Sequence, residues 1–387
     1  MIVCGIVVEY NPFHNGHLYH IKEARKLTNC DVLIAIMSPT FMQRGEPAII
    51  NKFDRTKFAL DHDIDLVIEM PSIFAIQSAN YFAKGALKIL NELKIDYLVF
   101  GSESNDLLTL KQAAKISLDS KYQSLVKKHL QNGQRYAIAC NNAFEDYNIN
   151  PIKLSNDILG LAYLQEIYQN NYEIEPISIK RNNEYLSTKI NSDIASATAI
   201  RNSLLNKDDI STLTPMATML EKKYDELVFL NDFFYILKYQ LLTNSIEQLK
   251  TIKGFDEGLE YLFKNTINKV SNIDDFINLV SSKRYPKTRI QRTIIYLICN
   301  IKKDELNVEI DYIRVLGMNS IGQKYLKKQK DKTSYKILTT LSKHNSLALD
   351  LEQRITNVYS LAKPSVNYLS KKEYQQSVII KKEHLND

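Results

Sequence analysis

Short apolar runs alternate with amphipathic segments along the first hundred residues of the chain. The apolar runs are rich in β-branched residues, as buried parallel strands should be, and the segments between them carry apolar residues at helical spacing. The expected strands are residues 2–8, 31–37, 65–70 and 97–100, and the expected helices are residues 17–27, 53–60 and 79–93. Because parallel strands need crossover helices, this alternation predicts an α/β fold, a doubly wound parallel sheet with its ligand site at the carboxyl ends of the strands.

The remainder of the chain has a mainly helical pattern, and no strand is expected after about residue 206. The expected elements are a strand at 174–180 and helices at 155–168, 198–205, 224–242, 289–301 and 335–349. The pattern therefore divides the chain into an α/β domain, residues 1–206, and a mainly helical C-terminal domain, residues 207–387.

The composition is that of a soluble globular protein. Apolar residues make up 44% and charged residues 24% of the chain, and no apolar run approaches the roughly 18 residues that span a membrane. The apolar N-terminal stretch has no basic flank and is broken by polar residues, so we do not expect a signal peptide. The four cysteines lie far apart without a C-x-x-C pair, which argues against a zinc site and a disulfide framework. We expect a cytoplasmic protein with no membrane segment.

The charge is unevenly distributed along the chain. The net charge is +6, yet residues 1–200 contain 20 Lys and Arg against 22 Asp and Glu, whereas residues 201–387 contain 30 against 22. The second half therefore offers positive charge to a large anionic partner.

The first expected strand leads directly into a turn that contains two histidines. Asn11-Pro12 breaks the strand and Gly16 allows a tight turn, so His14 and His17 lie beside the unpaired backbone N–H groups of a helix start. Such a helix end favours a phosphate, and imidazole donors could stabilise the charge that builds up on an attacked α-phosphate. Two nearby histidines can also be incidental or form half of a metal site. The strand-turn-helix context favours a nucleotide site.

This segment resembles the H-x-G-H signature of the nucleotidyltransferase superfamily, and the wider pattern is similar to that of the tRNA(Met) cytidine acetate ligase family. The resemblance rests on four segments in order, residues 8–17, 43–48, 100–103 and 194–201. They cover roughly the first half of the chain, and the second half has no comparably specific motif. Pro39 departs from the family pattern, which leads us to expect a glycine there.

The family resemblance implies an ATP-dependent ligase that activates acetate as acetyl-adenylate. The acetyl group would then pass to N4 of the wobble cytidine of elongator tRNA(Met), forming N4-acetylcytidine. Residues 1–206 would bind ATP and residues 207–387 would bind the tRNA. His14 and His17 would stabilise the α-phosphoryl transition state, and Mg²⁺ would shield the phosphates, although the sequence shows no dedicated carboxylate cage for it. No protein partner is evident, and no residue is identified that accepts the amine proton.

The same resemblance implies a set of ATP contacts. Three of them, considered alone, could instead be a turn glycine (Gly101), a helix cap (Asn156) and a surface charge (Arg181). The segment from Ser196 to Arg201 resembles a second phosphate-binding motif, which would hold the pyrophosphate, and a capping segment with a solvated arginine is the alternative. The implied ATP contacts are Gly5, Ile6, Val7, Val8, Glu9, Tyr10, Asn11, Pro12, Phe13, His14, Asn15, Gly16, His17, Gly101, Asn156, Arg181, Ser196, Thr198 and Arg201.

Basic residues are expected to bind the other substrates. Arg44, on the loop after the second strand, is a candidate for steering a small carboxylate or a phosphate. An acid-free stretch in the second half interleaves basic residues with Tyr285, and a lysine cluster follows at 324–330. Such stretches are often solvated helix faces, but the resemblance to a tRNA-modifying family favours RNA binding. The expected RNA contacts are Lys283, Arg284, Lys287 and Arg289.

Two other functions stay open. An H-x-G-H enzyme could adenylylate a small phosphorylated metabolite, but such an enzyme has no evident use for a basic helical half. A non-catalytic RNA-binding protein could use the nucleotide site only to sense ATP, but it would not need both His14 and His17.

Overall fold

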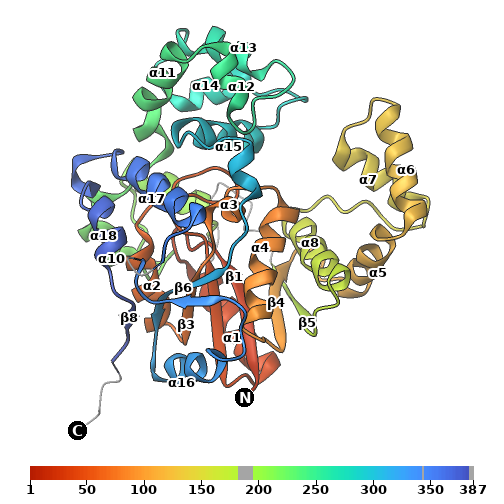
Figure 1. The fold of residues 1–387 in the computed structure, drawn as a ribbon, viewed down its shortest axis with the longest axis vertical. Helices are drawn as coiled ribbons and strands as arrows, with labels where there is room; N and C mark the ends of the chain where they lie inside the picture. Colours follow the sequence, from red (N-terminus) through yellow and green to blue (C-terminus); the bar gives the residue numbers. More distant parts are fainter. Residues whose placement is uncertain (182–194, 342–343, 383–387) are drawn as a thin grey trace.

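A mixed β-sheet forms the centre of the protein (Figure 1). The computed structural model describes residues 1–181, 195–341 and 344–382. Within these residues the sheet has eight strands in the order β5-β4-β1-β2-β3-β6-β7, and β8 pairs with β6. The five parallel strands are β1 Val3–Val8, β2 Val32–Met37, β3 Leu66–Glu69, β4 Tyr97–Ser102 and β5 Glu175–Lys180.

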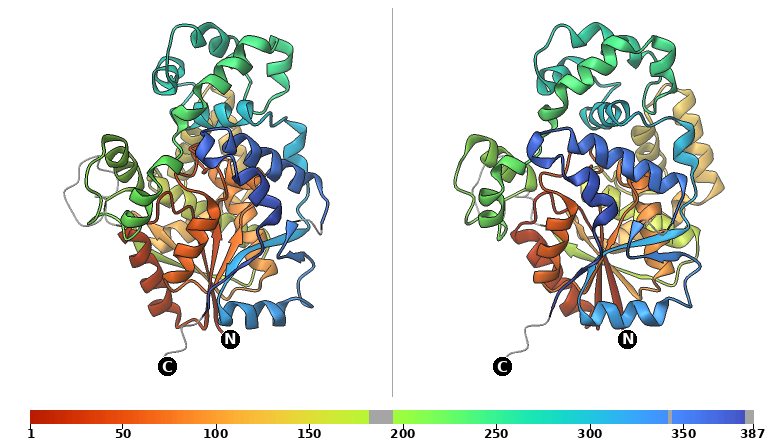
Figure 2. Two further views of the ribbon diagram at one scale, coloured as in Figure 1. Left: turned by 90° about the vertical axis from the view of Figure 1, so that its left-hand side faces the viewer. Right: turned by 60° about the vertical axis from the view of Figure 1, so that its left-hand side comes forward.

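Helices cover both faces of the parallel strands (Figure 2). Cys4, Ile6 and Val8 of β1 share a core with helices α1 Asn15–Thr28 and α2 Lys52–Asp61. Residues of β1 and β2 that point the opposite way pack against α4 Ala79–Glu92 and α8 Ser155–Gln169. This alternation follows the two-residue period of strands. The doubly wound α/β prediction is confirmed.

Between β4 and α8 the chain forms a helical arm, which stands apart from the sheet in Figure 1. Its helices have a small core of their own, which α8 completes. They are α5 Leu107–Ser117, α6 Ser120–Gln131 and α7 Tyr136–Glu145.

The second half contains a helical bundle that lies above the sheet (Figure 1). Two 3₁₀ turns, Tyr224–Glu226 and Leu230–Phe233, replace the first part of the helix expected at 224–242. The bundle core also includes Phe41 and Met42, so it packs against the loop that follows β2. Helices α9 Ala197–Asn206 and α10 Ala217–Lys222 precede the bundle and pack in the core that contains α1 and α2. The bundle helices are α11 Phe234–Thr243, α12 Ile246–Thr251, α13 Leu259–Ile267, α14 Ile273–Val280 and α15 Lys287–Ile298. None of the described helices combines the length and the apolar character needed to cross a bilayer.

The expectation that strands end near residue 206 is wrong. Strand β6 Tyr312–Met318 is buried throughout and pairs antiparallel with β3, and β7 Lys336–Leu338 and β8 Ile379–Ile380 pair with β6. The helix expected at 335–349 is also wrong in its first part, because β7 lies there and α17 begins only at Leu347. The remaining helices are α3 Ser72–Ala75, α16 Ser320–Gln329, α17 Leu347–Ser360 and α18 Leu369–Gln375.

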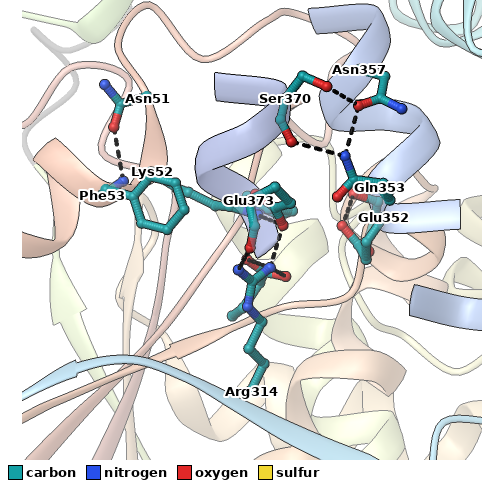
Figure 3. A network of polar contacts seen from close by, with 12 residues as sticks. Asn51, Lys52, Phe53, Arg314, Glu352, Gln353, Asn357, Ser370 and Glu373 are labelled. Carbon is teal, nitrogen blue, oxygen red and sulfur yellow. Dashed lines mark hydrogen bonds and ion pairs between the residues drawn. The ribbon is translucent and has the colours of Figure 1, made fainter. Parts of the chain in front are cut away.

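A buried ionic cluster ties the two halves of the chain together (Figure 3). Lys52 Nζ lies 2.7 Å from Glu69 Oε2 and 2.7 Å from Glu373 Oε1, and the guanidinium of Arg314 on β6 pairs with both carboxylates. Each of these four side chains contacts two side chains of opposite charge, so none is left as an unpaired buried ion, which would be costly. The two halves of the chain share both this cluster and the sheet. The division into two domains at residue 206 stays a prediction.

Candidate active site

A cleft of about 840 Å³ opens at the carboxyl ends of β1, β4 and β5. The structure brings together here the turn after β1, the loop after β2, the end of β4, the start of α8 and the start of α9. This is the expected place for a ligand in an open α/β sheet. The predicted residues that line the cleft are Val7, Val8, Glu9, Tyr10, Asn11, His14, Gly16, His17, Arg44, Gly101, Asn156, Arg181, Ser196, Thr198 and Arg201.

The two histidines of the turn cap helix α1 through each other. His14 is the N-cap residue, and its Nδ1 accepts a hydrogen bond from the backbone N–H of Gly16 at 3.1 Å. The backbone N–H of His14 donates to Nδ1 of His17, also at 3.1 Å, and the two rings stack with their centroids 3.8 Å apart. Because both Nδ1 atoms accept a hydrogen bond, each neutral ring carries its proton on Nε2. Both side chains are therefore hydrogen-bond donors at Nε2.

Burial keeps the imidazoles of the cleft neutral. It lowers the pKa of His14 to about 3, and the positive charges of Arg181 and Arg201 act in the same direction. The pKa of His17 is lowered well below its usual value, again mainly by burial. His20, which sequence reasoning missed, also lines the cleft, and burial lowers its pKa to about 4. At neutral pH these rings are therefore uncharged hydrogen-bond donors rather than imidazolium ions.

A buried arginine holds the ends of β1 and β2. Arg55 NH1 donates to the carbonyl of Glu9 at 2.7 Å and to that of Ser38 at 2.8 Å, its Nε donates to the carbonyl of Ile50 at 3.1 Å, and its NH2 donates to Pro39. Sequence reasoning missed this residue, because an arginine inside an amphipathic helix usually faces solvent. The same contacts show that the loop with Pro39 is tied to the turn that precedes His14.

One wall of the cleft is a chain of contacts from β4 to β5. A Cβ atom on Gly101 would lie 2.5 Å from Cδ of Arg181, so only glycine lets this side chain cross the strand. Arg181 NH1 donates to Oδ1 of Asn156, and Asn156 Nδ2 donates to Glu103 Oε1 at 2.7 Å. Glu103, not Asn156, caps α8, because its carboxylate accepts from the first backbone N–H groups of that helix. The ATP contacts expected of Gly101, Asn156 and Arg181 stay predictions.

The start of α9 forms another part of the cleft wall. Ser196 is the N-cap residue and accepts from the backbone N–H of Ala199 at 3.1 Å. Arg201 NH1 donates to the carbonyl of Asn11 at 2.7 Å, and its NH2 pairs with the carboxylate of Glu46. The capping interpretation of Ser196 is thus correct, and Arg201 is held in the cleft rather than solvated. Ile194, the first residue of the matched segment, lies outside the described residues.

Helix α15 closes the cleft from the second half of the chain, a contact that sequence reasoning missed. Thr288 and Arg292 line the cleft, and Arg292 NH1 donates to the carbonyl of Gln43 at 3.3 Å. Gly45 has φ +82°, and a Cβ atom there would lie 2.4 Å from the backbone N of Arg292. A glycine therefore lets the loop after β2 pack directly on α15.

The other predicted basic residues lie just outside the cleft. Lys283, Arg284 and Lys287 are exposed, and Arg289 is half-buried. The guanidinium groups of Arg284 and Arg289 lie 5.5 and 5.3 Å from the ring centroid of Tyr285, and both approach Glu257 at 3.5 Å. These residues continue the surface of α15 away from the cleft.

Among the described residues, no group of three or more His, Cys, Asp or Glu side chains is arranged to hold a metal ion. The carboxylates of Glu103 and Glu46 are instead engaged with the start of α8 and with Arg201.

Comparison with known proteins identifies this type of site. The family model described as HIGH Nucleotidyl Transferase matches residues 1–375. The fold and the pair of histidines that cap helix α1 are thus those of a HIGH nucleotidyltransferase. The chain is 39% identical to the tRNA(Met) cytidine acetate ligase of Oceanobacillus iheyensis, over 97% of this chain and 99% of that protein. It is 36% identical to that of Bacillus subtilis, over 93% and 92%. The chain therefore belongs to the tRNA(Met) cytidine acetate ligase family, as the resemblance predicted.

Solved structures agree with this assignment. The apo structure of Thermotoga maritima TmcAL superimposes with a TM-score of 0.91 at 32% identity, covering 98% of this chain and all of that one. A second structure of the same protein, bound with alpha-thio ATP, superimposes with a TM-score of 0.89 and covers 99% of this chain.

Proposed function

We propose that this protein is an ATP-dependent ligase of the cytoplasm that forms acetyl-adenylate from acetate and acetylates N4 of the wobble cytidine of elongator tRNA(Met). The observation that carries the proposal is the pair His14 and His17, two neutral Nε2–H donors fixed at a helix start within a cleft that also holds Arg181 and Arg201. Family membership supports it, and the Thermotoga maritima relative was solved with an ATP analogue.

In the first step, acetate would attack the α-phosphorus of ATP and pyrophosphate would leave. His14 and His17 would donate to the α-phosphoryl oxygens as negative charge builds up on them. Fixed neutral donors in a buried site need no reorganisation during the reaction. Arg201 and the N-terminus of α9 would offset the charge of the departing pyrophosphate. The ATP contacts inferred from the sequence, including Arg44 toward acetate, belong to this proposal, as does Mg²⁺ accompanying the phosphates.

In the second step, helix α15 would guide the RNA. The exposed residues Lys283 and Arg284, just before the helix, and Lys287, its first residue, would bind phosphates, while Thr288 and Arg292 of the same helix line the cleft. A tRNA bound along this helix would bring one unpaired base to the activated acetyl group.

The test is direct. Purified protein is incubated with ATP, acetate and a tRNA(Met) transcript, and digested nucleosides are analysed by mass spectrometry. We expect N4-acetylcytidine together with AMP and pyrophosphate. A stable adenylylated small molecule, or ATP binding without turnover, would contradict the proposal.

A further inference from the structure

The second step of the proposed reaction, on which this inference rests, releases a proton from the cytidine amine. Six histidine and carboxylate side chains line the cleft within the described part of the chain. They are His14, His17, His20, Glu9, Glu46 and Glu103. Their contacts differ enough to distinguish them.

Each of the three histidines already carries a proton on Nε2 and is a hydrogen-bond donor there. His14 and His17 each accept a backbone N–H at Nδ1 and so carry their own proton at Nε2. His20 Nε2 contacts the carbonyl of Val99 at 3.0 Å, which fixes a proton on that nitrogen as well. A further proton would make each ring cationic in a buried site that already contains Arg181.

Two of the three carboxylates are also occupied. Both oxygens of Glu103 accept hydrogen bonds from Asn156 and the first turn of α8, at 2.7 to 3.1 Å. Glu46 pairs with Arg201, so its charge is already neutralised by a guanidinium.

Glu9 is the carboxylate that is fixed in place with one oxygen left over. Its Oε1 accepts from the backbone N–H of Gln43 at 2.7 Å, and its own carbonyl is held by Arg55 at 2.7 Å. Its Oε2 accepts no hydrogen bond from the described residues, and the half-buried side chain lines the cleft.

We propose that Glu9 Oε2 accepts the N4 proton of cytidine during acetyl transfer. The N4 lone pair forms a bond to the acetyl carbonyl carbon, the bond from that carbon to the phosphate oxygen breaks, AMP leaves with the electron pair, and one N4 proton passes to Glu9. A carboxylate is also the group that recognises an exocyclic cytosine amine, because it accepts from the N4–H donors of cytosine, whereas uracil carries a carbonyl acceptor at that position. Glu9 would therefore orient the amine before deprotonating it.

The surroundings of Glu9 suit this role. Burial raises its pKa above the usual value and Glu46 acts in the same direction, whereas the Gln43 N–H, Arg44 and Arg201 oppose the shift. Arg55 is a further charge close to it. A more basic carboxylate is the better proton acceptor near neutral pH.

The test separates the two steps. Glu9→Gln keeps an oxygen for Gln43 but removes the base, so transfer to tRNA should fall much further than acetate-dependent exchange of pyrophosphate into ATP. Capture of the acetyl group by hydroxylamine, a nucleophile that attacks acyl adenylates without a base, should fall no further than exchange. The single-turnover rate of transfer to tRNA should fall about 100-fold. The decrease of this rate at acidic pH, which the wild type should show, should disappear. Glu9→Asp should recover part of the transfer rate, and Glu23→Gln, outside the cleft, serves as the matched control.

Either of two results would overturn the inference: full transfer by Glu9→Gln, or an equal loss of exchange and transfer, which would make Glu9 an ATP-positioning residue. Failure of the wild-type protein to form N4-acetylcytidine would instead count against the proposed function, so the two failures are distinguishable.

Discussion

The backbone N–H of His14 donates to Nδ1 of His17 at 3.1 Å, so the two residues fix each other's proton positions. The cap of helix α1 and the proposed chemistry thus depend on the same two side chains. Asparagine is an equally good N-cap, but its amide cannot place a donor where the imidazole Nε2 lies. The structural and catalytic contributions of His14 can therefore be separated by substitution.

We expect His14→Asn to lower the rate of acetate-dependent pyrophosphate exchange by 100- to 1000-fold, on the order of the loss of one transition-state donor. Its thermal stability should stay near that of wild type, whereas His14→Ala should also lose about 1 kcal/mol of stability because the cap is gone. Exchange assays and urea denaturation of both variants check this. Equal activity of the two variants and the wild type would show that His14 is only a cap.

The low pKa of His14 predicts how stability changes with acid. Between pH 6.5 and about 3 the unfolded chain binds a proton at this residue and the folded protein does not. Its contribution is therefore complete above pH 6.5 and is lost as the pH falls toward 3, by up to about 1.4 kcal/mol per pH unit. Urea denaturation at pH 7, 5 and 4 should show a smaller decrease for His14→Asn than for wild type. Identical pH slopes would mean that His14 does not stay neutral.

The contacts of Arg55 predict a large structural effect. Arg55→Met would leave the carbonyls of Glu9, Ser38, Pro39 and Ile50 without their donor in a buried site. We expect a loss of about 3 to 5 kcal/mol in the free energy of unfolding, since several buried acceptors lose their partner together. Lys57→Met, an exposed position on the same helix, should change stability by less than about 0.5 kcal/mol. Urea denaturation measures both, and similar values would contradict the assignment.

The contact between Gly101 and Arg181 predicts a binding effect. A Cβ atom at residue 101 would displace the Arg181 side chain, so Gly101→Ala should raise the KM for ATP about tenfold in the exchange assay. The double variant Gly101→Ala, Arg181→Met should bind ATP no more weakly than Arg181→Met alone, because both changes remove one contact. Additive losses would mean that Gly101 acts independently of Arg181.

The fold of the first hundred residues could be predicted from the sequence because its information is local. Apolar runs, crossover helices and the turn at Asn11-Pro12 each depend on neighbouring residues. The family resemblance also named Gly101, Asn156 and Arg201, which all line one cleft where the parallel strands β1, β4 and β5 end.

What could not be predicted depends on distant partners. Arg314 interrupts the apolar pattern of β6, and its charge is acceptable in a buried strand only because Glu69 and Glu373 neutralise it. In the same way, Arg55 and Arg292 look like ordinary helix surface residues until the loops that they contact are folded against them. No spacing within a single helix reports such contacts.

The position of α15 beside the cleft leads to a prediction for RNA binding. Charge reversal by Lys287→Glu with Arg289→Glu should weaken tRNA binding at least tenfold and reduce its dependence on salt, because phosphate contacts release counterions. Pyrophosphate exchange without tRNA should stay within about twofold of wild type, since neither residue lines the cleft. The matched control is Lys327→Glu with Lys328→Glu on α16, a helix that lies far from α15 in Figure 1. Lys328 Nζ lies 3.6 Å from Met1 Sδ, near the amino end of β1. Filter binding at several salt concentrations compares the two pairs. An equal loss from both would assign RNA binding to overall charge, whereas a loss confined to the α15 pair would locate it beside the cleft.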